Sequence, residues 1–513
     1  MSQAYGAGDT FQPLAGPILW ITGFVLALAN FMVVLDTTIA NVSVPNIAGG
    51  LAVSPSQGAW VVTSYSVAEA ITVPLSGWLV QRFGAVRVFV TAMIGFGLFS
   101  MACGGAPSLA ILVMCRVGQG LCGGPMMPLS QALMRRIFPA HLQAMATGFW
   151  SMTTVVGPLM GPLLGGAICD TIGWPWVFFI NLPFAFGGAY FARRLLAKAE
   201  TPTLRVPVDV VGLMLLIAWV GALQIMFDKG RELDWFESPF IIVLAVIAAV
   251  GFAAFLIWEL TDKHPIVDLR VFRHRGFAAI SAVMSIGFGT FFSTIVLLPL
   301  WLQTSMGYTA AWAGRVMALQ GVFAVIMSPV AARLTTVFDP RYLLMTGILI
   351  MAAATLWRAG ATTDANYWSL AMPQLLLGLG VPFFFVPAMT LALGSVEPRE
   401  VASAAGILNF TRTTAGAFGA SMIITAWTND TTSRHAELAG VLNTPQASID
   451  GMKAMGMTGA QSLGAFDRLV QGQAVMLSTD GLFIACALVF VCAACVVWLA
   501  PRPGAVAVPT DAH

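Results

Sequence analysis

A few ionisable side chains interrupt the long apolar stretches of this 513-residue chain, and they are where chemistry could occur. Asp36, Glu69, Arg116 and Arg412 each stand among aliphatic, aromatic or small neighbours. A charge placed in the hydrocarbon core of a membrane costs at least ~3 kcal/mol, so such residues face protein or water and serve a function. Desolvation favours the neutral form of an acid, whereas a nearby arginine favours the charged form. An acid under both influences can bind and release a proton as its surroundings change.

Three of these residues are predicted to act in proton coupling. At a rise of about 1.5 Å per residue, Asp36, Glu69 and Arg116 all fall in the outer half of their apolar runs. We therefore predict that Asp36 and Arg116 form a coupled pair. Glu69 is expected either to join the coupling or to recognise positively charged substrates. Two simpler interpretations stay open: Asp36 could be a solvated cap at a helix end, and Arg116 could bridge backbone carbonyl groups.

A second group of residues is predicted to contact substrate. Arg412 lies near the middle of its apolar run, where it would either contact an anionic substrate or hold the surrounding helices together. Arg315 lies near a helix end and can extend to the interface, so we assign it no role. Aromatic and methionine side chains adapt to ligands of varied shape and are expected to wall a cavity. The predicted substrate-contacting residues are Glu69, Met127, Phe149, Trp150, Phe292, Phe384 and Arg412.

The elements that position these residues must be membrane helices. Hydrophobic residues make up 58% of the chain and charged residues only 9%, against about 25% charged residues in soluble proteins. A net charge of +2, without a basic cluster, indicates no nucleic-acid partner. A helix needs about 20 apolar residues to cross the hydrocarbon core. Fourteen apolar runs meet or approach this length: residues 14–44, 60–80, 86–103, 109–133, 144–168, 176–191, 210–227, 240–260, 277–302, 310–334, 343–357, 368–393, 402–427 and 475–499.

The predicted fold is therefore an all-α polytopic membrane protein with both termini in the cytoplasm. Lys and Arg are concentrated in the connections on one side of the predicted helices, and such connections stay cytoplasmic. The expected divisions are a cytoplasmic tail at 1–13, a six-helix bundle at 14–200, two linker helices in 201–275, a second six-helix bundle at 276–500 and a cytoplasmic tail at 501–513. The second bundle is expected to contain an external loop at 428–474, which includes a short helix at 460–470.

Short motifs follow one another along the chain. They are LDTTIANVSVP at 35–45, GWLVQRFGAVR at 77–87, RVGQG at 116–120, GPLMGPLLGG at 157–166, WPWVFFINLP at 174–183, LQIMFDKGRELDWF at 223–236 and NFTRT at 409–413. Together they resemble the signatures of the major facilitator superfamily, and within it the fourteen-helix drug:proton antiporters of the EmrB and QacA type. The resemblance covers residues 15–501.

This resemblance implies a fold and a function. The fold is six helices, two linker helices and six further helices, arranged as two bundles around a central cavity. The function is proton-driven export of lipophilic drugs and other hydrophobic or amphiphilic molecules across a bacterial inner membrane, without a cofactor or bound metal. EmrB-like transporters work with an EmrA-like periplasmic adaptor and a TolC-like outer-membrane channel, so these partners are expected. The loop at 428–474 is then either a docking surface for the adaptor or an external cap.

The motif at 77–87 connects the second and third predicted helices. Its Gly77, Gln81, Arg82, Gly84 and Arg87 match positions that the superfamily uses in its conformational change. Gln81 stands where the family usually has an aspartate, which takes part in a charge network between helices. A glutamine can hydrogen-bond but cannot pair a charge, so this network is expected to be weaker here.

Glycine and proline alternate in the motif at 157–166. Its candidate conformational residues are Gly157, Pro158, Gly161, Pro162, Gly165 and Gly166. Three of the glycines recur every four residues, so they share one helix face on which a neighbouring backbone can approach closely. We predict that this face forms a seam between the two bundles that seals a proton leak. Ordinary close helix packing is the alternative.

Other function classes fit the residues less well. The histidines are scattered over loops and the tail, and the pair Cys492 and Cys495 lies in an apolar run, so neither an enzyme nor a metal site is predicted. An ATP-driven pump would need a glycine-rich phosphate-binding loop ending in Gly-Lys-Ser/Thr, which the sequence lacks. A uniporter or importer of a specific metabolite stays open, as does an exporter dedicated to one substrate such as fatty acids.

Overall fold

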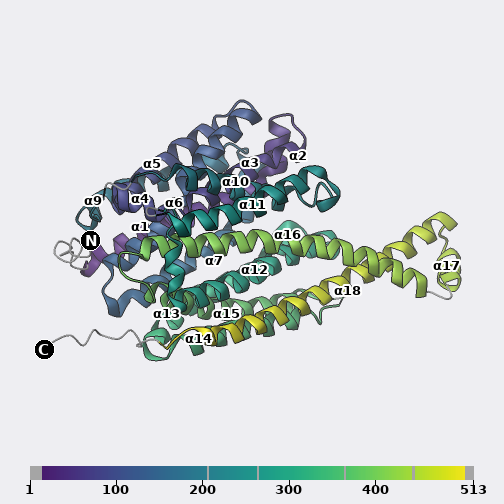
Figure 1. Cartoon of the computed structure of the whole chain (residues 1–513). Helices are drawn as coiled ribbons and strands as arrows, with labels where there is room; N and C mark the ends of the chain where they lie inside the picture. The colour runs from purple at the N-terminus through teal and green to yellow at the C-terminus, as the bar shows by residue number, and fades with distance from the viewer. Residues whose placement is uncertain (1–13, 205–206, 263–264, 363–364, 442–444, 503–513) are drawn as a thin grey trace.

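The computed structural model describes residues 14–204, 207–262, 265–362, 365–441 and 445–502, which form α-helices joined by turns and short 3-10 segments (Figure 1). Each predicted apolar run lies largely within one helix or two consecutive helices, and the two last runs belong to helices that are much longer, α16 (Val401–Val441) and α18 (Gly459–Val496). Lipid offers no hydrogen-bond partners to a backbone, so helices, which satisfy their own N–H and C=O groups, are what such runs adopt.

The first bundle, purple to blue in Figure 1, contains the helices that carry the predicted coupling residues. It consists of α1 (Gly16–Gly50), α2 (Pro55–Gly58), α3 (Trp60–Thr72), α4 (Ser76–Phe83), α5 (Ala85–Gly104), α6 (Leu109–Ile137), α7 (Gln143–Thr171), α8 (Trp176–Phe179) and α9 (Asn181–Leu195). Its core is aliphatic and aromatic, with Phe89, Phe96 and Phe138 almost fully buried.

Two predicted runs are broken, which corrects their description as single helices. Residues 60–80 divide into α3 and α4 on either side of Pro74, because proline lacks an N–H group and clashes with the preceding turn. The Ser76 hydroxyl donates to the Val73 carbonyl at 2.6 Å across this break. Residues 176–191 divide into α8 and α9 at Ile180. The break places Asn181 at the start of α9, from where its side chain enters the core.

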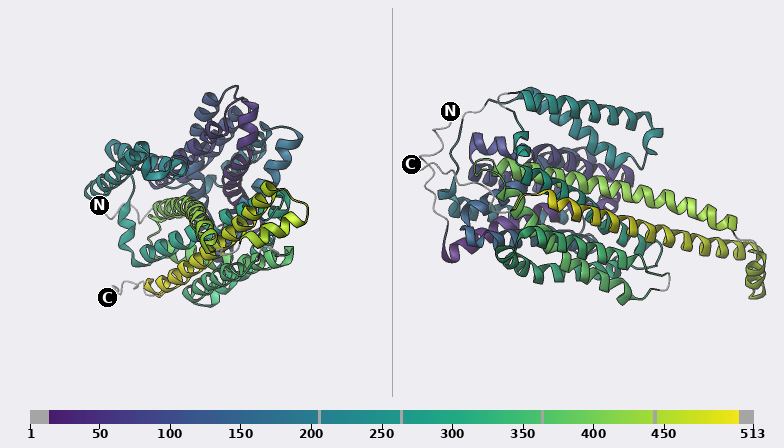
Figure 2. Two further views of the ribbon diagram at one scale, coloured as in Figure 1. Left: turned by 90° about the vertical axis from the view of Figure 1, so that its right-hand side faces the viewer. Right: turned by 60° about the horizontal axis from the view of Figure 1, so that its bottom comes forward.

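The second bundle, green to yellow in Figure 1, contains the remaining long helices. It consists of α12 (Arg275–Thr304), α13 (Ala310–Val337), α14 (Pro340–Arg358), α15 (Tyr367–Gly394), α16 (Val401–Val441), α17 (Pro445–Ala454) and α18 (Gly459–Val496). Between the bundles in sequence lie α10 (Val210–Lys229) and α11 (Pro239–Thr261), which the right-hand view of Figure 2 shows side by side along the flank. The outer face of α11 is apolar and exposed, as at Val250 and Ile257, which suits contact with lipid.

The segment 428–474, predicted as a loop, is mostly helical. α16 continues for 41 residues and α18 for 38, so both extend past the bundle as an arm with α17 at its tip (Figures 1 and 2). Short-range pairs support the extension: the Arg434 Nε lies 2.7 Å from the Asp430 carboxylate one turn earlier, and Thr458 with Gln461 forms a capping box. The predicted helix at 460–470 is the first part of α18.

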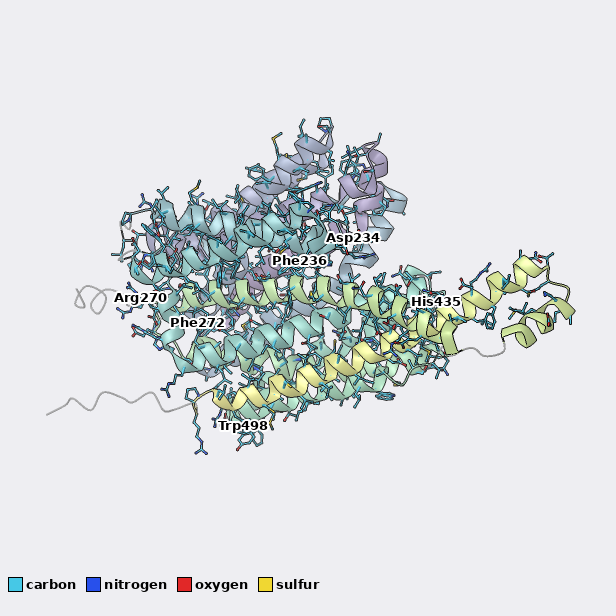
Figure 3. The ribbon with its side chains drawn as sticks, turned by 45° about the vertical axis from the view of Figure 1, so that its right-hand side comes forward. Asp234, Phe236, Arg270, Phe272, His435 and Trp498 are labelled. Carbon is cyan, nitrogen blue, oxygen red and sulfur yellow. The ribbon has the colours of Figure 1, made fainter. Side chains whose placement is uncertain are left out.

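Ten helices in the described part of the chain are long and apolar enough to cross a membrane. The halves of the two broken runs fall short individually, since the longest of them, α9, has 15 residues. Figure 3 separates the two ends of the molecule: Arg270, Phe272 and Trp498 lie at one end, and Asp234, Phe236 and His435 at the other. We call these the Arg270 end and the Asp234 end.

Candidate functional site

Asp36 and Arg116, predicted to pair, form a salt bridge between α1 and α6. The Nη1 atom of Arg116 donates to Oδ2 of Asp36 at 2.6 Å. Both side chains are fully buried. Asp36 lies well inside α1, which runs from Gly16 to Gly50, so the interpretation of Asp36 as a solvated helix cap is wrong.

Polar side chains from three further positions complete the surroundings of this pair. Oδ1 of Asp36 accepts hydrogen bonds from Gln119 Nε2 at 3.0 Å and from Asn181 Nδ2 at 2.7 Å. The Nε atom of Arg116 donates to the Val61 carbonyl at 2.9 Å. Its guanidinium also lies 4.1 Å from the centroid of the Tyr65 ring. Arg116 thus bridges a backbone carbonyl and an acid at the same time, and the pair contacts both α3 and α9.

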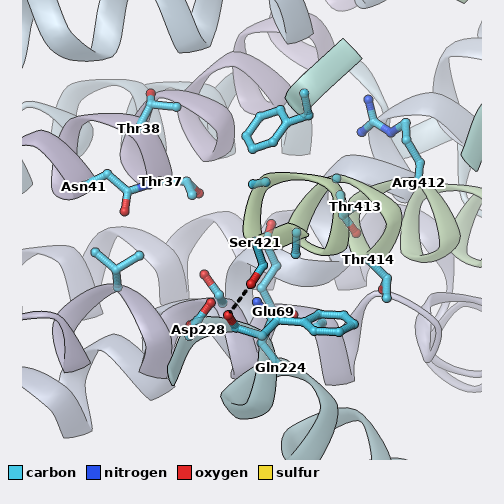
Figure 4. Close-up of a pocket in the computed structure, with 18 of the residues that line it drawn as sticks. Thr37, Thr38, Asn41, Glu69, Gln224, Asp228, Arg412, Thr413, Thr414 and Ser421 are labelled. Carbon is cyan, nitrogen blue, oxygen red and sulfur yellow. Dashed lines mark hydrogen bonds between the residues drawn. The ribbon is translucent and has the colours of Figure 1, made fainter. Parts of the chain in front are cut away.

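A cavity of about 690 Å³ lies between the two bundles (Figure 4). α1, α3, α6, α7, α10, α12 and α16 contribute to its wall. Four residues predicted to contact substrate line it, namely Glu69, Met127, Phe292 and Arg412. Asp36 is not among the lining residues, but its neighbours Val34, Thr37 and Thr38 are. The salt bridge therefore lies directly behind one wall of the cavity.

Three other residues predicted to contact substrate do not line the cavity. Trp150 is 1% exposed and donates its Nε1 to the Ser130 hydroxyl at 2.9 Å. Phe384 is fully buried against Phe385, with ring centroids 5.0 Å apart. Phe149 packs against the core, and its ring lies beside that of Phe24. These aromatic side chains fill space between helices and do not line the cavity in this conformation, and their role as substrate contacts stays a prediction.

Arg412 is a charged group of the cavity wall whose hydrogen-bond donors are only partly used. Its side chain is 1% exposed, with one Nη atom donating to Asn409 Oδ1 at 3.0 Å. Its Nε and its other Nη atom are buried without a hydrogen-bond partner. The guanidinium lies 4.8 Å from the centroid of the Phe288 ring. This arrangement leaves N–H donors available to an acceptor that enters the cavity.

The polar end of α10 lines the cavity, which the sequence interpretation missed. Gln224, Phe227 and Asp228 lie in its last two turns, and Arg231 and Glu232 follow it. These residues belong to the motif at 223–236, in which polar and charged residues directly follow an apolar run. That change in composition was the available signal, but it equally fits an ordinary helix end.

Comparison with known proteins identifies the family. Residues 26–420 match the Major Facilitator Superfamily model. The chain is 41% identical to the multidrug export protein EmrB of Escherichia coli K12 over 497 residues, which cover 96% of this chain and 97% of that protein. The chain belongs to the major facilitator superfamily. Within the superfamily it belongs with the EmrB-like proteins, so it is a multi-pass membrane transporter and not an enzyme.

Other relatives agree with this assignment. The fatty acid resistance protein FarB of Neisseria gonorrhoeae is 40% identical, with 96% of this chain and 98% of that protein covered. Among solved structures, the human organic anion transporter MFSD10 matches 93% of this chain and 100% of its own with a TM-score of 0.55 at 14% identity. The proton:xylose symporter XylE matches 92% of this chain and 94% of its own, with a TM-score of 0.54 at 15% identity. The structural matches support the superfamily fold.

The superfamily motif at 77–87 spans most of α4, the turn at Gly84 and the first residues of α5. Gly84 has a φ of +90°, and an added Cβ would lie 2.7 Å from Glu200 Cδ. The Glu200 carboxylate accepts from the backbone N–H groups of Val86 and Arg87 at 3.0 and 3.1 Å, which caps the start of α5. Gly84 is therefore required both by its backbone conformation and by this close approach.

The other motif residues occupy distinct positions. A Cβ added to Gly77 would lie 2.8 Å from Ser403 Cβ, so α4 and α16 of opposite bundles touch there. The Gln81 carbonyl accepts from the Leu204 N–H at 2.7 Å. Arg82 lies over the rings of Trp78 and Phe83, and Arg87 lies 3.8 Å from the Glu200 carboxylate.

The glycine face of α7 packs against α1, which corrects its prediction as a seam between the bundles. An added Cβ at Gly157 would lie 2.9 Å from Val34 Cβ, and one at Gly161 would lie 2.6 Å from Thr38 Cβ. At Gly165 an added Cβ would lie 3.1 Å from Ile39 Cγ1. Thr38 also donates to the Gly157 carbonyl at 3.3 Å. Gly166 has open space around it. Pro158 and Pro162 are part of α7, but their side chains lie outside the described residues.

Contacts between the two bundles include several direct polar and backbone contacts. Two are hydrogen bonds: Gln131 Oε1 accepts from Asn409 Nδ2 at 3.0 Å, and the Ser328 hydroxyl donates to the Gly148 carbonyl at 2.6 Å. Two are close approaches at glycine: Gly77 lies against Ser403, and an added Cβ on Gly406 would lie 2.9 Å from the Val73 carbonyl oxygen. The cavity, in contrast, reaches Val62 near the start of α3 and Glu232 beyond the end of α10. It therefore extends to the Asp234 end of the molecule.

Proposed function

We propose that the protein is a drug:proton antiporter that exports hydrophobic or amphiphilic small molecules across a bacterial inner membrane. The observation that carries the proposal is the fully buried Asp36–Arg116 pair behind the wall of an amphipathic cavity. The names of the relatives support the substrate range, since the first of them is a multidrug export protein.

The Asp36–Arg116 salt bridge is the interaction that protonation would change. A proton on Asp36 would cancel the charge that holds Arg116, whose remaining partners are the Val61 carbonyl, Gln119 and the face of Tyr65. Two of these partners belong to α3, the same helix that places Glu69 in the cavity. Protonation would thereby change how strongly α1 and α6 hold α3, and such a difference between states is what couples a ligand to a conformational equilibrium.

The proposed topology has fourteen membrane-spanning segments in a six, two and six arrangement, with the divisions predicted above and both termini cytoplasmic. The Arg270 end then faces the cytoplasm, in agreement with the rule that arginine-rich connections remain inside. The bundles touch through Gly77 and Ser403, and the cavity extends to the Asp234 end. The described conformation is therefore assigned as outward-facing.

The arm formed by α16, α17 and α18 projects from the Asp234 end (Figure 1). In the proposed topology it lies in the periplasm, where an EmrA-like adaptor would bind and lead to a TolC-like channel. Exposed apolar side chains on the arm, including Met455, Leu463 and Leu469, support its assignment as the docking surface.

The first prediction is that a pH gradient alone drives export. Proteoliposomes without nucleotide should accumulate a fluorescent lipophilic drug when a gradient is imposed, and collapse of the gradient with a protonophore should stop accumulation. Transport that continues after collapse and follows an imposed substrate gradient would indicate a uniporter instead.

A dedicated exporter of amphiphilic carboxylates is the second candidate function. The N–H groups of Arg412 that have no hydrogen-bond partner favour it, because a carboxylate forms strong, charge-assisted hydrogen bonds with a guanidinium. The name of the relative FarB points in the same direction. In the same vesicles, gradient-driven transport confined to long-chain fatty acids would favour this candidate over the multidrug exporter.

The second prediction concerns Glu69, a half-buried acid on the cavity wall. Glu69→Gln keeps the shape and removes the charge, so it should weaken binding of lipophilic cations about tenfold while neutral compounds bind as before, because the Coulomb attraction between the carboxylate and the cation is lost and tenfold corresponds to about 1.4 kcal/mol. Binding can be measured by fluorescence with a dansyl amide that ends in trimethylammonium and with its uncharged tert-butyl isostere.

Glu437→Gln provides a matched control for this prediction, because Glu437 is an exposed acid on the arm. An equal loss of transport for both probes in Glu69→Gln, with binding unchanged, would assign Glu69 to proton coupling. Unchanged binding and transport would leave it a structural residue.

A further inference from the structure

The linker helix α10 is attached to both bundles. On one side α10 packs along α3, where the Asp228 carboxylate lies near the Thr63 side chain. On the other side the Ser421 hydroxyl of α16 donates to the Phe227 carbonyl at 2.8 Å. The Phe227 ring also packs against Phe418 of α16, with centroids 5.4 Å apart. α10 therefore occupies the gap between α3 and α16 as an integral part of the transport domain.

The attached end of α10 forms a wall of the cavity. Gln224 and Asp228 are four residues apart, so their side chains lie on the same helix face, and both line the cavity. Figure 4 shows both beside Ser421, away from Arg412. An acidic group and an amide group thus stand together on one side of the cavity, supplied by a helix whose sequence identifies it only as a linker.

The charged residues near Asp228 leave its carboxylate available to a ligand. Lys229 follows it in sequence, but the Lys229 ammonium lies 2.7 Å from Glu232 Oε2 and 5.6 Å from the centroid of the Trp60 ring. Arg231, further along, also lines the cavity. The Thr63 side chain lies near this carboxylate, and a carboxylate can accept about four hydrogen bonds.

We propose that Asp228 and Gln224 of α10 form a subsite for the ammonium group of an amphiphilic organic cation, and that Asp228 acts together with Glu69 in the preference for cations. The inference rests on the proposed export function and adds a specificity-determining residue to its site. Asp228 is half-buried and Gln224 is buried, and Phe227 lines the cavity beside them. Charge pairs are stronger in such partly desolvated surroundings than in water, and the ring would contact the apolar part of the ligand.

The test is ligand binding to the full-length protein in detergent, with the same two dansyl probes. Asp228→Asn should raise the Kd for the trimethylammonium probe about tenfold, because the Coulomb attraction between the carboxylate and the quaternary ammonium is lost, while the Kd for the tert-butyl isostere stays within about twofold. Two controls accompany it. Thr63→Val removes the hydroxyl but keeps the carboxylate, and Asp234→Asn alters an acid of the same motif that does not line the cavity.

Both controls should retain the preference for the cation. Asp234 has a φ of +53°, in the left-handed region, which asparagine also adopts readily. The proposal would be overturned if Asp228→Asn raised the Kd of both probes equally and Thr63→Val did the same, because Asp228 would then only hold α10 against α3. An unchanged Kd for both probes in Asp228→Asn would also overturn it. Because binding is measured without a gradient, failure of the wild-type protein to transport would count against the proposed function alone.

Discussion

Asp36→Asn is expected to abolish gradient-driven export while substrate binding is retained. The substitution keeps the shape of the side chain but removes the group that can exchange a proton for Arg116. Since Asp36 does not line the cavity, the Kd for a neutral substrate should change little. We expect the transport rate in proteoliposomes to fall at least ~100-fold, the scale that corresponds to loss of a buried charge interaction of roughly 3 kcal/mol. Transport and binding are measured on the same preparation.

Stability has to be separated from coupling in this experiment. Asp36→Asn leaves the buried Arg116 charge without its partner, which costs about 3–5 kcal/mol in comparable cases. The double variant Asp36→Asn/Arg116→Gln removes both charges and should recover thermal stability without recovering transport. Full transport in either variant would contradict the role of the pair. Additive effects of Asp36→Asn and Arg116→Ala in a double-mutant cycle would also rule out coupling, and would direct attention to Glu69 and Arg412.

The pairing of Asp36 with Arg116 was predictable because charge inside an apolar run is rare and costly, so that few partners were available. Depth along the helices then placed both residues at the same level. Gln119 and Asn181, which complete the network, could not be selected in the same way. Neutral amides are common in membrane helices, and only the fold brings α6 and α9 together around Asp36.

The cavity wall was harder to predict. α6 and α7 are apolar around most of their circumference, so the sequence does not distinguish a face toward the cavity from a face toward a neighbouring helix. Trp150 and Met127 illustrate this: the former is buried against Ser130, and the latter lines the cavity. The contribution of α10 was missed for a related reason, since polar residues at the end of an apolar run usually mark the membrane surface.

Close packing along α7 was also predicted, but its partner was not. Four-residue spacing of glycine identifies a face that another backbone can approach, and it contains no information about which helix does so. The structure places α1 there. α1 therefore has two functional faces: Val34 and Thr38 pack on the glycines of α7, and Asp36 meets Arg116 of α6. The position of the ion pair consequently depends on how closely α1 and α7 approach.

This dependence leads to the final expected result, which is that Gly161→Leu eliminates transport although the protein still inserts and folds. A leucine at this position would collide with Thr38, since the first side-chain carbon alone would lie 2.6 Å from Thr38 Cβ. Overpacking of this kind costs typically ~1–3 kcal/mol, and here α1 can relieve it only by moving away from α7, which displaces Asp36.

Gly166→Leu is the matched control, because an added Cβ on Gly166 meets nothing within 4 Å. We expect normal yield for both variants, near wild-type transport for Gly166→Leu and at least a tenfold loss for Gly161→Leu. Equal transport by the two variants would show that the contact between α1 and α7 tolerates separation, and that Asp36 does not depend on it.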